Sequence, residues 1–189
     1  MTSTREIDAV THEQIWAPWR LAYIQQQGEA GQGADPDRRE LAFLEGANPN
    51  CFLCQAVADA QDRRRYVVDR GERSITVLNR YPYNNGHLLV APRPHYARLD
   101  ELSRSERTEL ADVIARMVGV LEELLSPEGF NIGLNLGQAA GAGLPGHLHW
   151  HIVPRWNGDT NFMPALASVR VIPQSLDALW EALAAASAR

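Results

Sequence analysis

The clearest pattern in the chain is an alternation of polar and apolar residues at positions 146–156. His147, His149 and His151 stand two apart, with apolar or aromatic residues between them. Because side chains alternate between the two faces of a β-strand, a strand places all three imidazoles on one side. A helix would scatter them around its axis. The spacing therefore predicts a strand, and we expect Pro154 to end it, because proline cannot donate to a ladder.

The pattern before this strand predicts a hairpin and one long helix. Residues 74–79 and 87–92 are apolar, β-branched runs separated by turn-forming residues, which is typical of a hairpin. Ser103 and Glu106 form a capping-box pattern. Behind them apolar residues recur at helical spacing, and the helix is expected to end before Pro127. These apolar positions are Leu110, Val113, Ile114, Met117, Val118, Leu121, Leu124 and Leu125.

Three further elements complete the predicted fold. A short helix follows Cys54, and residues 130–136 form a strand that a loop at 137–146 joins to the histidine strand. A short amphipathic helix near the C-terminus is expected to pack in the core through Leu176, Leu179, Trp180 and Leu183. This order predicts an α+β fold with a mostly antiparallel sheet of about five strands, one long helix and a C-terminal helix.

The chain is expected to divide into three parts. Residues 1–49 form an N-terminal arm, residues 50–164 the folded domain, and residues 165–189 a C-terminal extension with its helix. The arm holds an aromatic patch at 15–24, for which packing onto the body or a partner subunit is favoured over ligand stacking. A stretch rich in Gly, Gln, Asp and Arg at 28–39 is predicted to be a flexible insert.

Composition narrows the functional classes. The chain has 189 residues, of which 45% are hydrophobic and 22% charged, so one ordinary globular domain with extensions is expected. The formal net charge of −5 argues against nucleic-acid binding. No apolar run is long enough to span a bilayer, and the N-terminus lacks the apolar core of a signal peptide. We therefore expect a cytoplasmic protein that binds neither nucleic acid nor a membrane.

Three aligned imidazoles can bind a metal, transfer protons or attack an electrophile. The alternative is a row of polar side chains on a solvated face. The loop at 137–146 contains four glycines, which allow backbone N–H groups to approach an anion closely. By itself such a loop is more often a plain connector. Directly before the three histidines, however, it favours an oxyanion or phosphate cradle.

Cys51 and Cys54 stand at metal-chelating spacing, and two cysteines cannot build a disulfide framework. A zinc ion would need two more ligands, for which His95 and one histidine of the row are candidates. A redox pair is less supported, because no thioredoxin-like βαβ pattern lies nearby. Two buried free cysteines remain the other alternative.

These motifs together resemble the histidine triad (HIT) superfamily. The resemblance rests on Gly86–Pro92, on His95, on the long helix and on the run from His147 to Arg155, and it covers roughly residues 51–155. The Trp-Ala-Pro-Trp-Arg arm and the segment 155–164 resemble the bacterial diadenosine tetraphosphate hydrolase or phosphorylase branch, related to the fragile-histidine-triad type.

The resemblance implies a role for each motif residue. His149 corresponds to the nucleophile that becomes adenylylated, His151 to the residue that contacts phosphate and assists the leaving group, and His87 to a supporting histidine. Asn79 corresponds to a ribose contact, and Asn135 lies where the family places a residue near the phosphates. The resemblance further implies that backbone groups of the loop hold phosphate oxygens, and the loop residues concerned are Gly141, Ala142, Gly143 and Leu144.

The resemblance also implies a structural Zn²⁺ bound by Cys51, Cys54, His95 and His147, no organic cofactor, and a homodimer whose sheets continue across the interface. This chain departs from the family in the loop, where Gly143-Leu144-Pro145-Gly146 replaces Gly-Gln-Ser/Thr-Val and the loop is one residue longer. A hydroxyl contact with phosphate is thereby lost. His151, where other branches have glutamine, favours the hydrolase-like branch.

The expected function is cleavage of dinucleoside polyphosphates, such as diadenosine tetraphosphate or triphosphate. Cleavage at the α-phosphate would proceed through a nucleotidyl-histidine, with water or inorganic phosphate as the acceptor. Two alternatives stay open. One is a nucleoside phosphoramidase of the Hint type, which shares the triad. The other is a nucleotide-binding signalling module with slow turnover.

Overall fold

The computed structural model describes residues 41–160 and 171–188. The aromatic patch at 15–24 and the insert at 28–39 lie outside the described residues. Within the described ranges the strands form one antiparallel sheet in the order β1-β2-β3-β5-β4. The strands are β1 (Val67–Arg70), β2 (Ser74–Leu78), β3 (Leu88–Pro92), β4 (Gly129–Leu134) and β5 (Trp150–Arg155).

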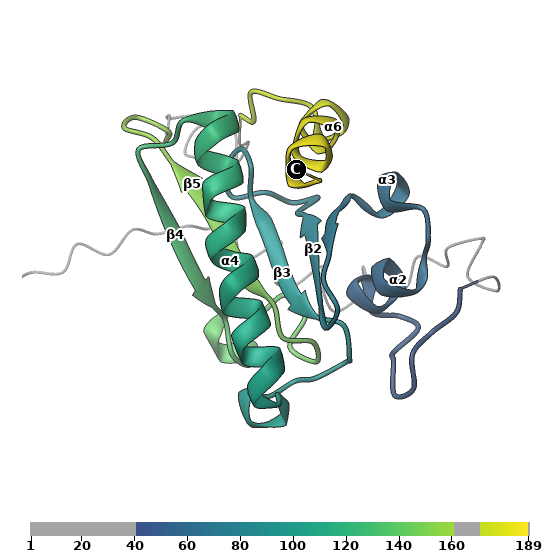
Figure 1. Cartoon of the computed structure of the whole chain (residues 1–189). Helices are drawn as coiled ribbons and strands as arrows, with labels where there is room; N and C mark the ends of the chain where they lie inside the picture. The colour runs from purple at the N-terminus through teal and green to yellow at the C-terminus, as the bar shows by residue number, and fades with distance from the viewer. Residues whose placement is uncertain (1–40, 161–170, 189) are drawn as a thin grey trace, which may run out of the picture.

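Helices cover both faces of this sheet (Figure 1). The long helix α4 lies along one face, α6 packs against the end of α4 and against β1, and α2 lies on the opposite face with α3 beside it. The helical segments are α2 (Phe52–Ala58), α3 (Asp62–Arg65), η3 (Leu99–Glu101), α4 (Arg104–Leu125), η4 (Gln138–Ala140) and α6 (Leu176–Ser187). The predicted α+β fold with a five-stranded antiparallel sheet is confirmed.

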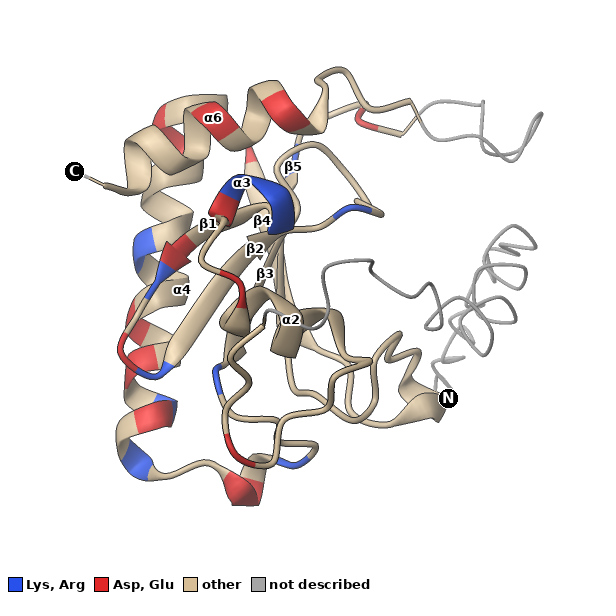
Figure 2. Ribbon diagram, turned by 90° about the vertical axis from the view of Figure 1, so that its right-hand side faces the viewer, with Lys and Arg blue, Asp and Glu red and all other residues tan. Residues whose placement is uncertain are grey.

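Helix α4 begins at the predicted capping box. The Ser103 hydroxyl accepts a hydrogen bond from the Glu106 N–H, and the Glu106 carboxylate accepts one from the Ser103 N–H. Acidic and basic residues recur along α4 (Figure 2). Its inner side carries a buried apolar stripe, Leu110, Val113, Met117 and Leu121. This amphipathic division fixes α4 against the sheet face that faces away from the histidines.

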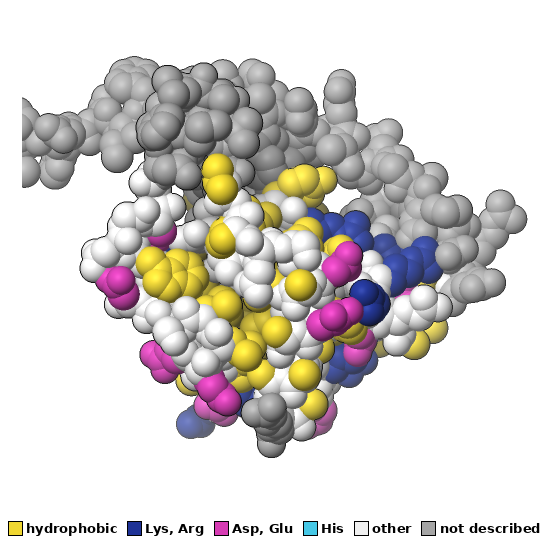
Figure 3. Space-filling view, turned by 90° about the horizontal axis from the view of Figure 1, so that it is seen from above, with side chains coloured by type: hydrophobic (Ala, Val, Ile, Leu, Met, Phe, Trp, Pro, Cys, Tyr) yellow, Lys and Arg dark blue, Asp and Glu magenta, His cyan; other side chains and the backbone are white. Residues whose placement is uncertain are grey.

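The main core lies between the sheet, α4 and α6. Leu88, Val90 and Ile152 enter it from the strands, and Leu179 and Leu183 enter it from α6. Figure 3 views the α6 end of the molecule from above and shows apolar side chains gathered there with charged ones around them. The prediction that the C-terminal helix packs in the core is therefore confirmed.

A second cluster lies on the opposite face of the sheet, beneath α2. Leu89 and Ala91 of β3 enter this cluster, whereas Leu88 and Val90 enter the main core, as strand alternation requires. Cys51 and Cys54 belong to this second cluster. The face of the sheet that carries the histidines is thus the face that α2 covers in part.

The sequence pattern did not predict β1 or α3, and the expected end of the histidine strand was wrong. Pro154 lies inside β5, opposite Phe130 of β4. No hydrogen bond of the sheet is lost through its missing N–H, because the pairing of β5 with β3 ends at the Leu88–Ile152 pair, before Pro154 is reached. The carbonyl of Pro154 instead accepts a hydrogen bond from the Asn84 side chain.

Thr76 offers a test of this packing. Its side chain is fully buried in β2, and its hydroxyl oxygen has no hydrogen-bond partner within the described residues. A buried hydroxyl without a partner is destabilising. Thr76→Val keeps the shape and removes the hydroxyl, so we expect the free energy of unfolding to rise by about 1 kcal/mol. Urea denaturation measures this, and a loss of stability would show that the hydroxyl is satisfied in solution.

Candidate active site and metal centre

His149 is buried immediately before β5, and its contacts fix its tautomer. Its Nδ1 lies 2.8 Å from the carbonyl oxygen of His147. A carbonyl can only accept a hydrogen bond, so Nδ1 carries the proton and Nε2 keeps a free lone pair. Burial also lowers the pKa of His149 from its ordinary value. The ring therefore presents a neutral imidazole with a nucleophilic Nε2.

His151 lies next to His149 and is paired with a histidine that directly precedes another strand. The ring centroids of His149 and His151 are 5.0 Å apart. His151 Nδ1 lies 2.9 Å from Nε2 of His87, the residue that precedes β3. The structure thus brings together the three histidines for which the sequence predicted catalytic roles.

The hairpin loop between β2 and β3 holds His87 from its other side. His87 Nδ1 accepts a hydrogen bond of 3.0 Å from the Tyr83 N–H and lies 3.2 Å from the Asn79 amide nitrogen. The Tyr83 ring stacks over His151, with centroids 5.7 Å apart. The structure therefore places Asn79 against a histidine, a contact that its expected ribose role did not include. Sequence reasoning missed Tyr83, because a tyrosine in a Pro-Tyr turn gives no catalytic signal.

The glycine-rich loop folds partly on itself. The N–H groups of Gly141 and Ala142 donate to carbonyls within the loop, and the Asn135 amide donates to the Gly141 carbonyl at 3.5 Å. Within the described chain, the N–H groups of Gly143 and Leu144 form no hydrogen bond. Of the four loop residues from Gly141 to Leu144, therefore, Gly143 and Leu144 are the two whose N–H groups are not used within the loop.

Asp159 ties the hairpin loop to the end of β5. Its buried carboxylate accepts hydrogen bonds from Asn84 at 2.8 Å and from the Arg155 guanidinium at 2.6 and 3.0 Å. The Arg155 hydrogen bond is the largest cause that holds the pKa of Asp159 well below its usual range. This clamp holds the loop that carries Tyr83 against the strand that carries His151.

Removing the charge of Asp159 is expected to change the free energy of unfolding in a way that depends on pH. A carboxyl whose pKa is lowered by folding stabilises the fold above its unfolded pKa, about 3.9, and loses that contribution as pH falls through the folded pKa. We expect Asp159→Asn to lower the free energy of unfolding by about 2 kcal/mol at pH 7. The difference from wild type should shrink progressively below about pH 4. Denaturation across pH measures this, and a difference independent of pH would contradict the clamp.

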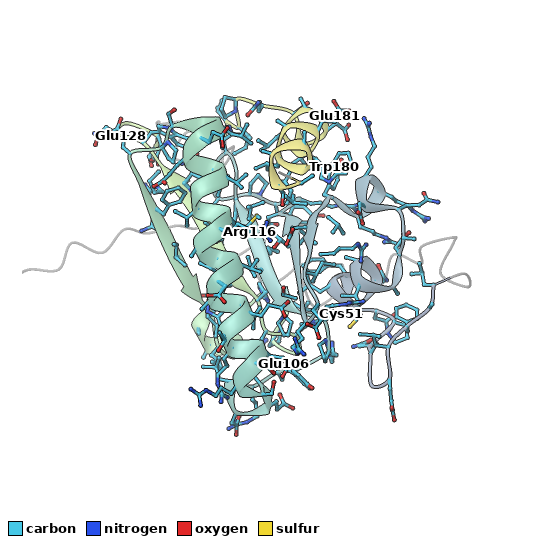
Figure 4. All side chains as sticks on the ribbon, viewed as in Figure 1. Cys51, Glu106, Arg116, Glu128, Trp180 and Glu181 are labelled. Carbon is cyan, nitrogen blue, oxygen red and sulfur yellow. The ribbon has the colours of Figure 1, made fainter. Side chains whose placement is uncertain are left out.

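Two thiols and two imidazoles come together at the start of the histidine run (Figure 4 labels Cys51). Cys51 Sγ lies 3.3 Å from His147 Nδ1, and Cys54 Sγ lies 3.2 Å from His95 Nδ1. All four ligand atoms lie within 4.8 Å of one another. The structure thus assembles the predicted set Cys51, Cys54, His95 and His147.

The donor chemistry of this cluster fits zinc. His147 Nε2 lies 2.9 Å from the Pro92 carbonyl, so it carries the proton and leaves the Nδ1 lone pair for a metal. A hydrogen bond from the Cys51 thiol lowers the pKa of Cys54 and raises that of Cys51, so the pair shares one proton and Cys54 is the sulfur that favours the thiolate form. Tetrahedral zinc with these ligands has ligand–ligand separations of about 3.3–3.8 Å. The 3.3 Å between His95 Nδ1 and His147 Nδ1 agrees with that value.

None of the helices within the described ranges is both long and apolar enough to cross a membrane. The large apolar side chains exposed on the folded body are scattered over several elements, and Ile132 on β4 is one of them.

Comparisons with known proteins agree with this architecture. A Mycobacterium tuberculosis protein named AP-4-A phosphorylase is 38% identical over 164 residues, which cover 87% of this chain and 78% of that protein. A zinc-bound histidine triad family protein from Mycobacterium smegmatis has 31% identity and a TM-score of 0.54, covering 65% of this chain and 84% of that one.

A histidine triad nucleotide-binding protein from Sulfolobus tokodaii shares the fold, with a TM-score of 0.58 at 24% identity, over 73% of this chain and 92% of that one. The family model described as the HIT domain matches residues 61–158, which include β1 to β5 and the three clustered histidines. On these grounds the chain belongs to the HIT family.

Proposed function

We propose that this protein cleaves dinucleoside polyphosphates by nucleotidyl transfer through His149. The observation that supports the proposal most is the fixed tautomer of His149, whose Nδ1–H is held by the His147 carbonyl so that a neutral Nε2 is presented. A neutral imidazole beside a second histidine is suited to attack at phosphorus. The 38% identical relative named AP-4-A phosphorylase supports diadenosine tetraphosphate as the substrate.

In the proposed binding mode the α-phosphate sits between His149 and the glycine-rich loop. The N–H groups of Gly143 and Leu144, with His151 opposite, donate to its oxygens as negative charge develops. Asn79 stays the proposed ribose contact, because its amide has a second hydrogen beyond the one directed at His87. Asn135 acts indirectly by holding the loop through the Gly141 carbonyl.

The proposed reaction has two steps, formation of a nucleotidyl-histidine and its transfer to an acceptor. His149 Nε2 attacks the α-phosphorus in line, and the bond to the bridging oxygen breaks, so ATP leaves with the electron pair and AMP remains on His149. The acceptor then attacks the same phosphorus from the opposite side, and the phosphorus–nitrogen bond returns its electron pair to His149. Inorganic phosphate as the acceptor yields ADP, and water yields AMP.

We propose that zinc binds Cys51, Cys54, His95 and His147 as a closed structural site. The metal supplies rigidity when bound, because four protein ligands leave no open position for substrate. His147 donates to the Pro92 carbonyl and is followed two residues later by the nucleophile. The residues of this cluster therefore fix the backbone on which His149 stands.

We also propose that the protein is a homodimer that pairs through β4. This strand lies at the edge of the sheet, and Ile132 near its middle is 47% exposed. An exposed apolar residue on an edge strand favours association of two sheets. Sedimentation equilibrium tests this directly, and a monomer at micromolar concentration would refute it.

Product analysis tests the proposed function and identifies the acceptor. Diadenosine tetraphosphate is incubated with the protein in buffer with and without inorganic phosphate. We expect ADP and ATP to appear in the presence of phosphate, as the identity to AP-4-A phosphorylase suggests. AMP and ATP in buffer alone would identify a hydrolase with the same first step. The absence of products under both conditions would refute dinucleotide cleavage.

A further inference from the structure

The environment of His87 determines where its proton lies. The Tyr81 N–H donates to the Asn79 side-chain oxygen at 3.0 Å, so this amide can face His87 only through its NH₂ group. His87 Nδ1 consequently meets two donors, the Asn79 NH₂ at 3.2 Å and the Tyr83 N–H at 3.0 Å. Neither donor can accept a hydrogen bond in return. His87 Nδ1 is therefore unprotonated, and the proton of the ring lies on Nε2.

The position of the proton on His87 determines its position on His151. His87 Nε2–H points to His151 Nδ1 at 2.9 Å, so that nitrogen accepts and the single proton of His151 lies on Nε2. An additional proton is unfavourable at either ring. On His87 Nδ1 it would face the donors from Asn79 and Tyr83, and on His151 Nδ1 it would face the N–H of His87. These contacts therefore favour the neutral form of both rings.

A neutral His151 can donate a hydrogen bond, but it cannot readily give its proton away. Loss of the Nε2 proton would leave an imidazolate, because His87 cannot replace the proton without becoming an anion itself. A leaving phosphate requires no proton, since it departs as a stable anion with the electron pair of the broken P–O bond. A leaving amine does require one, because a P–N bond would otherwise release an amide anion.

We propose that the neutral His87–His151 pair restricts this site to substrates whose leaving group departs as an anion, and that Asn79 sets this restriction. The proposal rests on the proposed function and sharpens its substrate class, to phosphoric anhydrides and away from phosphoramidates. Asn79 is a specificity-determining residue in this account. It acts through His87: together with the Tyr83 N–H, its backbone-fixed amide keeps a second proton off His87 Nδ1, and of these two donors it is the one that a substitution can turn into an acceptor.

The test replaces Asn79 by an acceptor of the same size. Asn79→Asp places a carboxylate next to His87 Nδ1, which can then bind a proton and become an imidazolium. His87 can in turn pass a proton through His151 to a leaving amine, with the proton regained from solvent. Wild-type kcat/KM should be about 100-fold higher for diadenosine tetraphosphate than for adenosine 5′-phosphoramidate. Asn79→Asp should reduce that ratio about 10-fold or more by a gain on the phosphoramidate.

A matched control places the same charge change elsewhere. Asn131 of β4 accepts a hydrogen bond from Arg155, a contact that Asn131→Asp retains. This variant should leave the substrate ratio of the wild type unchanged. An equal change in both variants would show a general effect of charge, and wild-type activity on the phosphoramidate equal to that on the anhydride would overturn the proposal.

A spectroscopic readout separates this proposal from the proposed function. Nitrogen-15 NMR of histidine-labelled protein at the pH of the assay should show His87 with an unprotonated Nδ1 and both His87 and His151 as neutral imidazoles. Asn79→Asp should bring in an imidazolium signal under the same conditions. A wild-type imidazolium signal from either residue would overturn the neutral pair whatever the enzyme cleaves. An NMR result as expected, without cleavage of either substrate, would instead refute the proposed function alone.

Discussion

Replacing His149 by alanine is expected to lower kcat for diadenosine tetraphosphate by about 10⁴-fold or more. The reason is that the neighbouring histidines direct their lone pairs to other partners. His147 directs its Nδ1 to the cysteines, and His151 directs its Nδ1 to His87. Loop and zinc contacts do not involve the His149 ring, so KM should change little. Steady-state kinetics with product separation by chromatography measures both parameters.

His149→Gln is the matched control for this prediction. Its amide can still donate to the His147 carbonyl in place of Nδ1–H, so the local packing is preserved in part. Glutamine has no nucleophilic nitrogen, and the variant should be as inactive as His149→Ala. If His149→Gln retained turnover within about 10-fold of wild type, His149 would hold the substrate and another group would attack.

Loss of the metal is expected to have the second large effect. Cys54→Ser removes one thiolate from the four-ligand cluster, so zinc content measured by atomic emission should fall from about one ion per chain to near zero. We expect the free energy of unfolding to fall by at least about 3 kcal/mol, because binding to the folded state alone stabilises it. Activity should fall as well, since His147 lies two residues before the proposed nucleophile, His149.

Chelation provides the control for this prediction. Wild-type protein that has lost zinc to a chelator should show the same reduced stability as Cys54→Ser in urea denaturation, and added zinc should restore only the wild type. Two thiols and two imidazoles at this spacing make zinc the expected occupant. Purified protein without zinc and with unchanged stability after the substitution would contradict a structural metal site.

The sequence was most informative where pattern and packing coincide. The capping box and the apolar stripe of α4 are local signals that tertiary contacts reinforce, and α4 begins at Arg104 as the box predicts. Strand β1 was missed because Val67 and Val68 give only two apolar positions in four residues. The strand exists through pairing with β2 and through the Trp180 indole, which donates to the Val67 carbonyl at 2.8 Å. Such long-range contacts are not encoded in local pattern.

In the candidate site, too, local sequence patterns predicted some features, whereas others depend on long-range contacts. The spacing of the histidines predicted that they share one face, and the Cys-x-x-Cys motif predicted a metal site whose four ligands now lie together. The backbone donors could not be predicted. The Tyr83 N–H, the Tyr81 N–H and the loop carbonyls act through the conformation of the chain, which any residue type can supply. For that reason the contact between Asn79 and His87 could be found only in the folded structure.

Nucleotidyl transfer through His149 is tested by the covalent state of this residue during turnover. Wild-type protein is mixed with diadenosine tetraphosphate in the absence of inorganic phosphate, quenched in alkali within milliseconds to seconds, digested and examined by mass spectrometry. We expect an AMP adduct on the peptide that contains residues 146–155, located at His149 and absent from His149→Gln. Turnover without an adduct, or an adduct on another residue, would contradict nucleotidyl transfer through His149.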